Sequence, residues 1–291
     1  MKKAEGFNQE RTFGIEIEFF GVSKHDAAQA IKDETGIECR GEYYNHETQD
    51  YWKIVSDASV DYEGLELVSP PLAGDEGLKE LENVLEALNG AGAEVNRSCG
   101  IHVHHDVNDY ELRNFKQLLG LYIRYEPAID ELFPKSRRKN NNRYCRTFSP
   151  ANNRGYGGRR TKRDPHNMVD RIKRADCIQD MTSSVVGSKY FKLNFNSYRK
   201  YGTVEFRQHS GSTDYRKLSS WIFLTQAMVE RAGNSTLQIK AEGAKDWFNF
   251  KKAIRAYGWM GADDKLQNAI KFFNKRRRHF ADKFDTELIS A

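Results

Sequence analysis

Apolar and polar residues alternate one by one along several short stretches of this chain, which is the period of a β-strand with one buried face. In the first stretch, Thr12–Phe20, phenylalanine and isoleucine fill every second position, and Glu16 and Glu18 stand between them. Another such stretch ends at Pro70 and Pro71, which cannot continue a strand ladder. Strands are therefore predicted at 12–20, 37–43, 51–56, 65–69, 100–107, 190–196 and 202–209.

Stretches with apolar residues three or four positions apart predict helices between these strands. The first helix has Ser23 as its cap and Asp26 three positions later, a pairing typical of a helix N-terminus. Helices are predicted at 23–35, at 77–88 with an end at Gly90, from a cap at Asn108 or Asp109 to 133, at 166–175, from a cap at Ser212 or Thr213 to 231, and twice after 244.

The order of strands and helices has no regular β-α-β rhythm. An α+β fold is therefore expected, with a largely antiparallel, curved sheet and helices packed on one face. A chain of 291 residues can form one large domain with a helical appendage. We predict a main domain at 1–236, with a basic loop at 135–165, and a C-terminal helical extension at 237–291.

The composition, with 38% hydrophobic and 30% charged residues, is typical of a soluble globular protein. No apolar run approaches the roughly 18 residues needed to span a bilayer, and the N-terminus turns polar where a secretory signal needs an apolar stretch. The four cysteines lie far apart without a CxxC pair, so zinc-finger spacing is absent and reduced thiols are expected. These features predict a cytoplasmic protein with no membrane partner.

The positive charge is concentrated in one segment. Of the 46 Lys and Arg residues, eleven lie between 135 and 163, where there is no Asp or Glu, which leaves 35 basic against 41 acidic residues elsewhere. The segment is too poor in apolar residues to form a packed element, so a loop or lid is predicted. The shorter basic run Lys275–Arg278 is typical of a solvated helix face.

Polar side chains share one face in four of the predicted strands, because residues two apart in a strand point the same way. Each strand alone has an ordinary explanation, such as a solvated face or a cross-strand ion pair. Together they predict a site, because carboxylates brought into contact are costly unless cations neutralise them. The residues on this face are Glu16 and Glu18; Glu66; His102, His104 and Asp106; and Glu205, Arg207 and His209.

A donor set dominated by carboxylates favours Mg²⁺ or Mn²⁺ over Zn²⁺, which prefers histidine and cysteine. Arg207 beside such a set is suited to hold a phosphoryl group, because its planar guanidinium matches phosphate oxygens. Metal ions and an arginine around anionic oxygens are the requirements of phosphoryl transfer.

The order of these motifs resembles the glutamine-synthetase-like fold, and within it the amidoligase family of carboxylate–amine ligases. The likeness runs from about Thr12 to about Trp221. It rests on four motifs together, which are Glu16-Ile-Glu18, Gly64-Leu-Glu-Leu-Val-Ser-Pro70, Ser98-Cys-Gly-Ile-His-Val-His104 and Gly202-Thr-Val-Glu-Phe-Arg207.

The resemblance implies a glutamine-synthetase-like catalytic domain at 1–236 and assigns roles to residues that match the motifs. Arg207 would contact phosphate, and His104 would act beside the metals on the substrate side, which makes these two the implied catalytic residues. The implied metal ligands are Glu16, Glu18, Glu66, His102 and Glu205, with Asp57 as a further acidic ligand.

The resemblance also implies a reaction in which ATP, with Mg²⁺ or Mn²⁺, phosphorylates a carboxylate and an amine then displaces phosphate from the acyl phosphate. The product is an amide or an isopeptide bond. Arg137, Arg138 and Arg143 begin the basic loop and are predicted to contact the phosphates of ATP. Eleven cations exceed what one ATP requires, which predicts an acidic or polymeric substrate, namely a peptide, a wall fragment or a nucleic acid.

Three other functions stay open at this point. His102, His104 and a glutamate could hold zinc for a hydrolase, although the surplus of carboxylates argues against it. The basic segment 135–163 could bind nucleic acid without catalysis, which leaves the acidic face unexplained. A kinase could use the same fold without forming an amide. The products formed from ATP separate these readings.

Overall fold

The structure is a computed structural model, and it describes residues 8, 10–148, 165–234, 245–255 and 264–284. The predicted basic loop at 135–165 lies partly outside the described residues, from 149 to 164, and so does the predicted domain boundary at 236.

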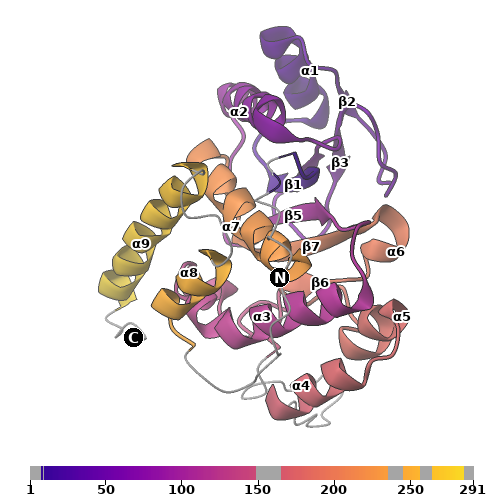
Figure 1. The fold of residues 1–291 in the computed structure, drawn as a ribbon. Helices are drawn as coiled ribbons and strands as arrows, with labels where there is room; N and C mark the ends of the chain where they lie inside the picture. Colours follow the sequence, from indigo (N-terminus) through magenta and orange to yellow (C-terminus); the bar gives the residue numbers. More distant parts are fainter. Residues whose placement is uncertain (1–7, 9, 149–164, 235–244, 256–263, 285–291) are drawn as a thin grey trace.

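Seven strands form one sheet in the order β2-β3-β4-β1-β5-β7-β6 (Figure 1). All neighbouring strands are antiparallel except β2 and β3, which confirms the predicted largely antiparallel sheet. The strands are β1 (Phe13–Phe19), β2 (Cys39–Gly41), β3 (Trp52–Ser56), β4 (Leu65–Val68), β5 (Gly100–Asp106), β6 (Leu193–Asn194) and β7 (Thr203–Ser210). Strand β6 is shorter than the predicted 190–196, because Phe191 pairs with Arg146 before β6 begins.

Helices pack against the apolar face of the sheet, as expected for the α+β class (Figure 1). Helix α7 packs between α3 and α9, and α8 contacts both α3 and α7. The helices are α1 (Lys24–Thr35), α2 (Gly74–Gly90), α3 (Leu112–Asp130), α4 (Pro165–Arg174), α5 (Ile178–Asp180), α6 (Tyr198–Tyr201), α7 (Tyr215–Gly233), α8 (Trp247–Arg255) and α9 (Asp264–Phe284), with a 3-10 turn η1 (Lys135–Arg137) and a π-helical turn η3 (Met181–Val185).

The core lies between this face and the helices. Every second residue of β1, such as Ile15 and Ile17, is fully buried there. Trp221 of α7 is also fully buried and meets the rings of Phe206 and Phe133 edge on. Packing of this kind favours the core face by about 25 cal/mol for each Å² of apolar surface removed from water. The apolar face of the sheet thus stabilises the fold, and the polar face is available for a functional site.

Two of the predicted helix caps are wrong. Helix α3 begins after Glu111, which caps it together with Asn114, because the carboxylate of Asp109 is held by two 2.8 Å hydrogen bonds from Arg11. Helix α7 is capped by Asp214, whose side chain accepts a hydrogen bond from the main-chain N–H of Lys217. The predicted cap at Ser23 is confirmed.

A β-bulge interrupts the pairing of β5 with β7. Ile101 lies opposite His209, but Val103 lies opposite Phe206, so β7 holds one more residue than β5 over this span. Because the extra residue reverses the alternation, His209 faces the helices, where it is fully buried against Phe133 and Trp221. The prediction that His209 shares a face with Arg207 is therefore wrong.

Within the described residues, no helix combines the length and apolar content required to cross a membrane.

Candidate active site

The polar residues predicted on one face of the sheet come from four adjacent strands, β4, β1, β5 and β7. The register places Glu18 opposite Glu66 and Glu16 opposite His102. On the other side of β5, His104 lies opposite Glu205. The antiparallel pairing of these strands therefore brings together six residues that are up to 189 positions apart in the chain.

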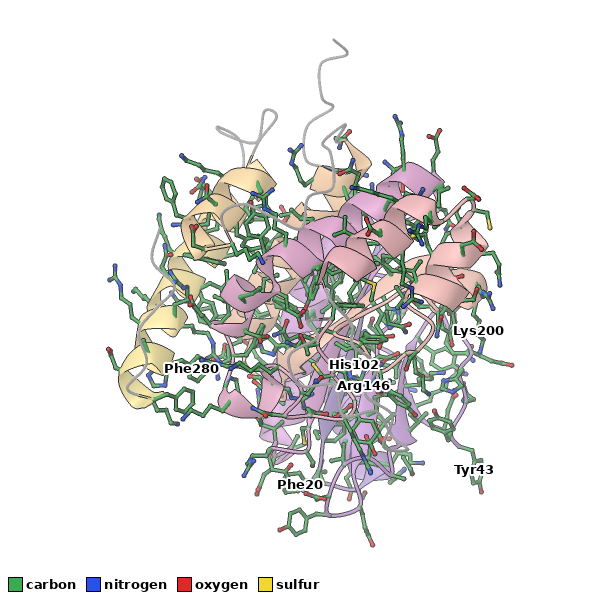
Figure 2. The ribbon with its side chains drawn as sticks, turned by 90° about the horizontal axis from the view of Figure 1, so that it is seen from below. Phe20, Tyr43, His102, Arg146, Lys200 and Phe280 are labelled. Carbon is green, nitrogen blue, oxygen red and sulfur yellow. The ribbon has the colours of Figure 1, made fainter. Side chains whose placement is uncertain are left out.

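His102 lies at the centre of this group, in the interior of the molecule, whereas Tyr43 and Phe280 lie toward its periphery (Figure 2). Its Nδ1 is 2.8 Å from an oxygen of Glu16, 3.6 Å from one of Glu205 and 3.9 Å from one of Glu66. Its Nε2 is 3.5 Å from Glu18. Four carboxylates thus surround one imidazole. We call these five residues the site cluster.

Two of these carboxylates are held in place by fixed donors. The main-chain N–H of Gly100 donates a 2.6 Å hydrogen bond to Glu18. The amide of Asn194 on β6 donates a 2.6 Å bond to one oxygen of Glu205, and Arg207 donates to the other oxygen. Side chains held in this way are preorganised, so little ordering is needed when a ligand binds.

The pKa values of Glu66 and Glu16, both in the site cluster, are shifted in opposite directions. Burial, together with the negative charges of Glu16 and Glu18, raises the pKa of Glu66 well above its ordinary value. Burial also acts to raise the pKa of Glu16, but hydrogen bonds from His102 and His104 outweigh it and lower that pKa. Like charges this close leave one carboxylate poorly compensated unless cations are present.

Burial likewise opposes the ionisation of Glu205, but the positive charge of Arg207, together with His104 and His102, outweighs it and lowers the pKa of Glu205. The pKa of Arg207 is raised in turn, because Glu205 and Glu16 act against the effect of burial. The Glu205–Arg207 pair therefore stays fully ionised in the site.

The donor atoms suit divalent cations. Within the described part of the chain, three sets have ligand atoms within 4.8 Å of one another, and each contains at least two carboxylates and no more than one histidine. Such oxygen-rich sets fit Mg²⁺ or Mn²⁺ better than Zn²⁺. The sets are Glu16 with Glu66 and His102, Glu16 with His104 and Glu205, and Glu18 with Asp57 and Glu66. The structure thus brings all six predicted metal ligands into these sets, and it adds His104 to them.

The four predicted arginines do not all reach this site. Arg207 and Arg137 line the cavity above the site cluster. Arg138 donates to the carbonyl oxygen of Phe133 at 2.7 Å and lies near Phe280 and Phe284 of α9. Arg143 is exposed and lies over the ring of Tyr144. Neither Arg138 nor Arg143 lines the cavity among the described residues.

Arg137 is unusual because it is buried without a carboxylate partner among the described residues. Only 3% of its surface is exposed, and its guanidinium donates to the main-chain carbonyls of Ser98 and Cys99. Its Nε has no hydrogen-bond partner among the described residues. A buried cation left uncompensated costs free energy, so a site for an anion is expected in front of it.

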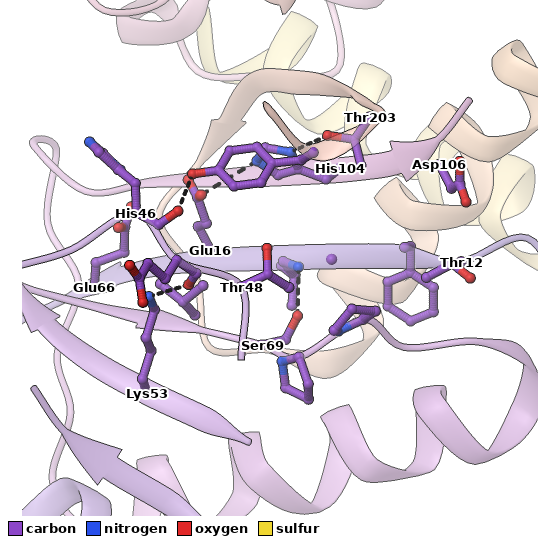
Figure 3. Close-up of a pocket in the computed structure, with 18 of the residues that line it drawn as sticks. Thr12, Glu16, His46, Thr48, Lys53, Glu66, Ser69, His104, Asp106 and Thr203 are labelled. Carbon is purple, nitrogen blue, oxygen red and sulfur yellow. Dashed lines mark hydrogen bonds and ion pairs between the residues drawn. The ribbon is translucent and has the colours of Figure 1, made fainter. Parts of the chain in front are cut away.

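Two cavities meet at the site cluster. The first, of about 370 Å³, contains the basic side chains Arg137, Arg207, Lys189 and Lys200, and we call it the cationic cavity. The second, of about 380 Å³, runs along β1 between β4 and β5, and we call it the apolar cavity (Figure 3). Its walls include Phe13, Val68, Pro70 and Pro71. Glu16, Glu66, His46, His104 and Tyr201 line both.

Lys53 and Asn194 are among the residues of these cavities that were missed from the sequence, as are Lys189 and Lys200. Lys53 is 2% exposed, lines the apolar cavity and donates to the side chain of Asn45 at 2.5 Å and to the carbonyl of Glu47 at 2.6 Å (Figure 3). Asn194 fixes Glu205. A lysine among the apolar residues of the strand WKIVS was the available signal for Lys53, whereas Asn194 gave none.

Residues 9–229 match a family model described as "Putative amidoligase enzyme". None of the curated proteins matches the chain. Among solved structures, 97% of the chain aligns with 66% of a chain in the complex between prokaryotic ubiquitin-like protein Pup and its ligase PafA, at 9% identity and a TM-score of 0.41. The alignment thus spans just under two thirds of that chain. A GmaS/ADP complex aligns over 96% of this chain and 71% of its own, at 13% identity and a TM-score of 0.42.

Proposed function

The chain belongs to the amidoligase family of C–N bond-forming enzymes, and we propose that it is an ATP-dependent carboxylate–amine ligase that works through an acyl phosphate. The observation that carries the proposal is the site cluster, in which four carboxylates surround His102 and two arginines face the same cavity. Such a set of charges suits the binding of metal ions and the transfer of a phosphoryl group between them.

The two cavities suggest where the reactants bind. The apolar cavity has apolar residues in its lining that suit the base of a nucleotide, with the phosphates directed to the site cluster. The cationic cavity suits the anionic acid substrate, because Arg137, Lys189 and Lys200 line it. The carboxylate to be activated would then meet the γ-phosphoryl group where both cavities share Glu16 and Glu66.

The protein's own residues have distinct roles in this scheme. Glu16, Glu18, Glu66, His102 and Glu205, with Asp57, would hold the divalent cations. Those cations, when bound, neutralise the phosphate oxygens and polarise the transferred group. Arg207 and Arg137 would hold the transferring phosphoryl group, which replaces the predicted contacts of Arg138 and Arg143 with ATP.

In the first step an oxygen of the substrate carboxylate attacks the γ-phosphorus of ATP, and ADP leaves. In the second step the amine nitrogen attacks the acyl carbon, phosphate leaves, and the nitrogen loses a proton. The cationic cavity would also accept an acidic or polymeric acid substrate, such as a peptide, because its cations exceed the charge of one carboxylate.

The test is to incubate the purified protein with ATP, Mg²⁺ and panels of acids and amines, and to identify the products. We expect ADP and phosphate, with ¹⁸O from a labelled substrate carboxylate appearing in the phosphate. AMP and pyrophosphate as products would refute the acyl-phosphate mechanism.

Two variants serve as controls for this experiment. Glu18→Gln and Glu205→Gln should each lower turnover by at least about 10²-fold, since losses of that size follow disruption of a metal's surroundings. Their circular dichroism spectra should match the parent. Normal turnover in both variants would remove the metal-site proposal.

A further inference from the structure

A groove of about 630 Å³ lies between α7 and α9, which run side by side (Figure 1). These helices belong to the layer that covers the apolar face of the sheet, whereas the site cluster lies on the polar face. No residue that lines this groove also lines the cationic or the apolar cavity. We call it the basic groove, and it is a concave surface separate from the proposed active site.

The lining of the basic groove contains five cations and, among the described residues, no carboxylate. One of the cations, Lys265, forms an ion pair with Asp75 of α2. The other four side chains are exposed and have no carboxylate partner among the described residues. They are Arg216, Lys271, Lys275 and Arg278. The groove therefore has positive charge that the described part of the protein does not neutralise.

The basic run Lys275–Arg278, predicted as a solvated helix face, divides between two roles. Arg276 and Arg277 are directed to the segment that follows α3, where they donate to a main-chain carbonyl oxygen and to a carboxylate oxygen. These two arginines hold α9 in place. Lys275 and Arg278 line the basic groove instead. Half of the run thus stabilises the fold, and the other half is available to a partner.

Lys271, Lys275 and Arg278 form a stripe along one face of α9, because residues three and four positions apart on a helix are neighbours. Like charges at this spacing destabilise a helix, so the stripe does not serve the fold. Lys271 and Lys275 are separated along the helix axis by about 6 Å. In an extended chain, side chains on one face recur about every 6.6 Å. The stripe therefore matches acidic residues at alternate positions of an extended peptide.

The uncharged residues of the basic groove also favour a peptide. Ser219 and Asn268 carry groups that both donate and accept hydrogen bonds, as the main-chain amides of a peptide require. A single-stranded nucleic acid would need open aromatic rings on which its bases could stack. Phe223 is only 9% exposed, and the ring of Phe272 lies under the guanidinium of Arg216. No ring among the described residues of the groove is therefore open for stacking.

We propose that the basic groove is a docking site for an extended acidic segment of a partner protein, held by ion pairs with Lys271, Lys275 and Arg278. The carboxylates of such a segment would supply the charge that the groove lacks. Docking uses no residue of the site cluster, so this proposal does not depend on the proposed ligase reaction.

The test measures, by fluorescence anisotropy at low salt, the binding of a fluorescein-labelled peptide of alternating glutamate and glycine. We expect binding that weakens as salt is added, and none when glutamine replaces glutamate in the peptide. The triple variant Lys271→Gln, Lys275→Gln, Arg278→Gln should raise the Kd at least about 10-fold, because three modest ion pairs are lost together. Its circular dichroism spectrum and its ATP turnover should match those of the parent protein.

The matched control carries Arg113→Gln, Lys173→Gln and Lys252→Gln, which remove the same charge from exposed positions outside the groove. It should leave the Kd unchanged. An equal loss in this control would show that only net charge matters, and the inference would be overturned. No binding of the acidic peptide to the parent protein would overturn it as well.

Two further outcomes would place the binding elsewhere or change the partner. Lys189→Gln combined with Lys200→Gln removes cations of the cationic cavity. Loss of peptide binding in this double variant, with binding kept in the triple variant, would place the peptide in the active site and contradict the proposal. Single-stranded oligothymidylate that binds more tightly than the peptide, and is lost in the triple variant, would make the groove a nucleic-acid site instead.

Discussion

Among the described residues, two groups of neighbouring buried carboxylates are compensated in different ways. In the first, which we call the Lys192 cluster, Lys192 is completely buried, 2.8 Å from an oxygen of Glu126 and 2.5 Å from one of Asp130. Main-chain N–H groups of Lys139 and Phe148 occupy the remaining oxygens of the two carboxylates, and Gln208 also donates to Asp130. This cluster therefore carries its own counter-charge, although burial still raises the pKa of Glu126.

The site cluster has more negative charge and less compensation. Its carboxylates share Arg207 and the site histidines, and the pKa of Glu66 is raised well above its ordinary value by burial and by its neighbours. This difference separates buried charges that stabilise the fold from buried charges that form a binding site. A cluster with its own lysine stabilises the fold, whereas a cluster whose carboxylates outnumber its cations is arranged for ligands that supply more of them.

The largest effect on stability is expected from removing the lysine of the Lys192 cluster. Lys192→Met would leave Glu126 and Asp130 buried without a counter-charge, so the free energy of unfolding should fall by about 3–5 kcal/mol. Urea unfolding followed by circular dichroism measures it. Glu66→Gln is the matched variant in the site cluster, and it should leave the stability of the metal-free protein unchanged or raised, because it removes a like-charge repulsion. A similar loss in both variants would erase the distinction between the clusters.

Divalent cations should act on the site cluster alone. At a concentration 100 times its Kd, Mg²⁺ or Mn²⁺ should raise the free energy of unfolding by about 2.7 kcal/mol. Thermal unfolding with and without the ion measures this gain. Glu205→Gln should lose most of it, whereas Glu126→Gln, although less stable, should keep it. A Tm that does not respond to either ion would contradict the metal-site proposal.

A smaller effect distinguishes the two faces of β7. His209, on the apolar face, has its pKa lowered from 6.5 to about 3, mainly by burial and further by Arg276. The folded state therefore binds fewer protons than the unfolded state between these values, and stability should fall as the pH drops below about 6.5, by at most about 1.4 kcal/mol per unit. His209→Phe should flatten that part of a pH series of urea unfolding curves. An unchanged slope would show that other groups cause the acid sensitivity.

The smallest effect is expected at Arg143. Because its guanidinium lies over Tyr144 at the surface and does not line either cavity, Arg143→Gln should change the rate of ATP turnover by less than about 2-fold, as for most surface substitutions. Arg137→Gln, made in the same basic segment, should lose clearly more. Equal losses would return Arg143 to the site as originally predicted.

The sequence predicted the strands and the shared polar face because alternation with a period of two is a local property. It could not predict the bulge that turns His209 to the helices, since one extra residue in β7 is visible only against its partner β5. Lys192 lies inside a predicted strand, but its buried ion pairs could not be predicted, because its partners Glu126 and Asp130 come from α3, more than 60 positions away.

The basic loop shows a second limit of prediction from the sequence. Arg137 and Arg138 are adjacent in sequence, yet the 3-10 turn η1 ends between them, so that Arg137 faces the cationic cavity and Arg138 faces α9. Charge and composition identified the segment, but the direction of each side chain depends on the turn and on the helices packed against it.

The strand order also has a consequence for how the chain folds. Glu16, Glu66 and His102 can be brought together by β1, β4 and β5, but Glu205 joins them only when β7 pairs with β5, a contact of high sequence separation and therefore expected to form late. Strand β7 carries Arg207 two positions after Glu205, so the step that adds the last carboxylate also delivers its counter-charge. The charge of Glu205 is thus compensated in the same event that adds it, so the assembling sheet need not wait for a metal ion before β7 pairs.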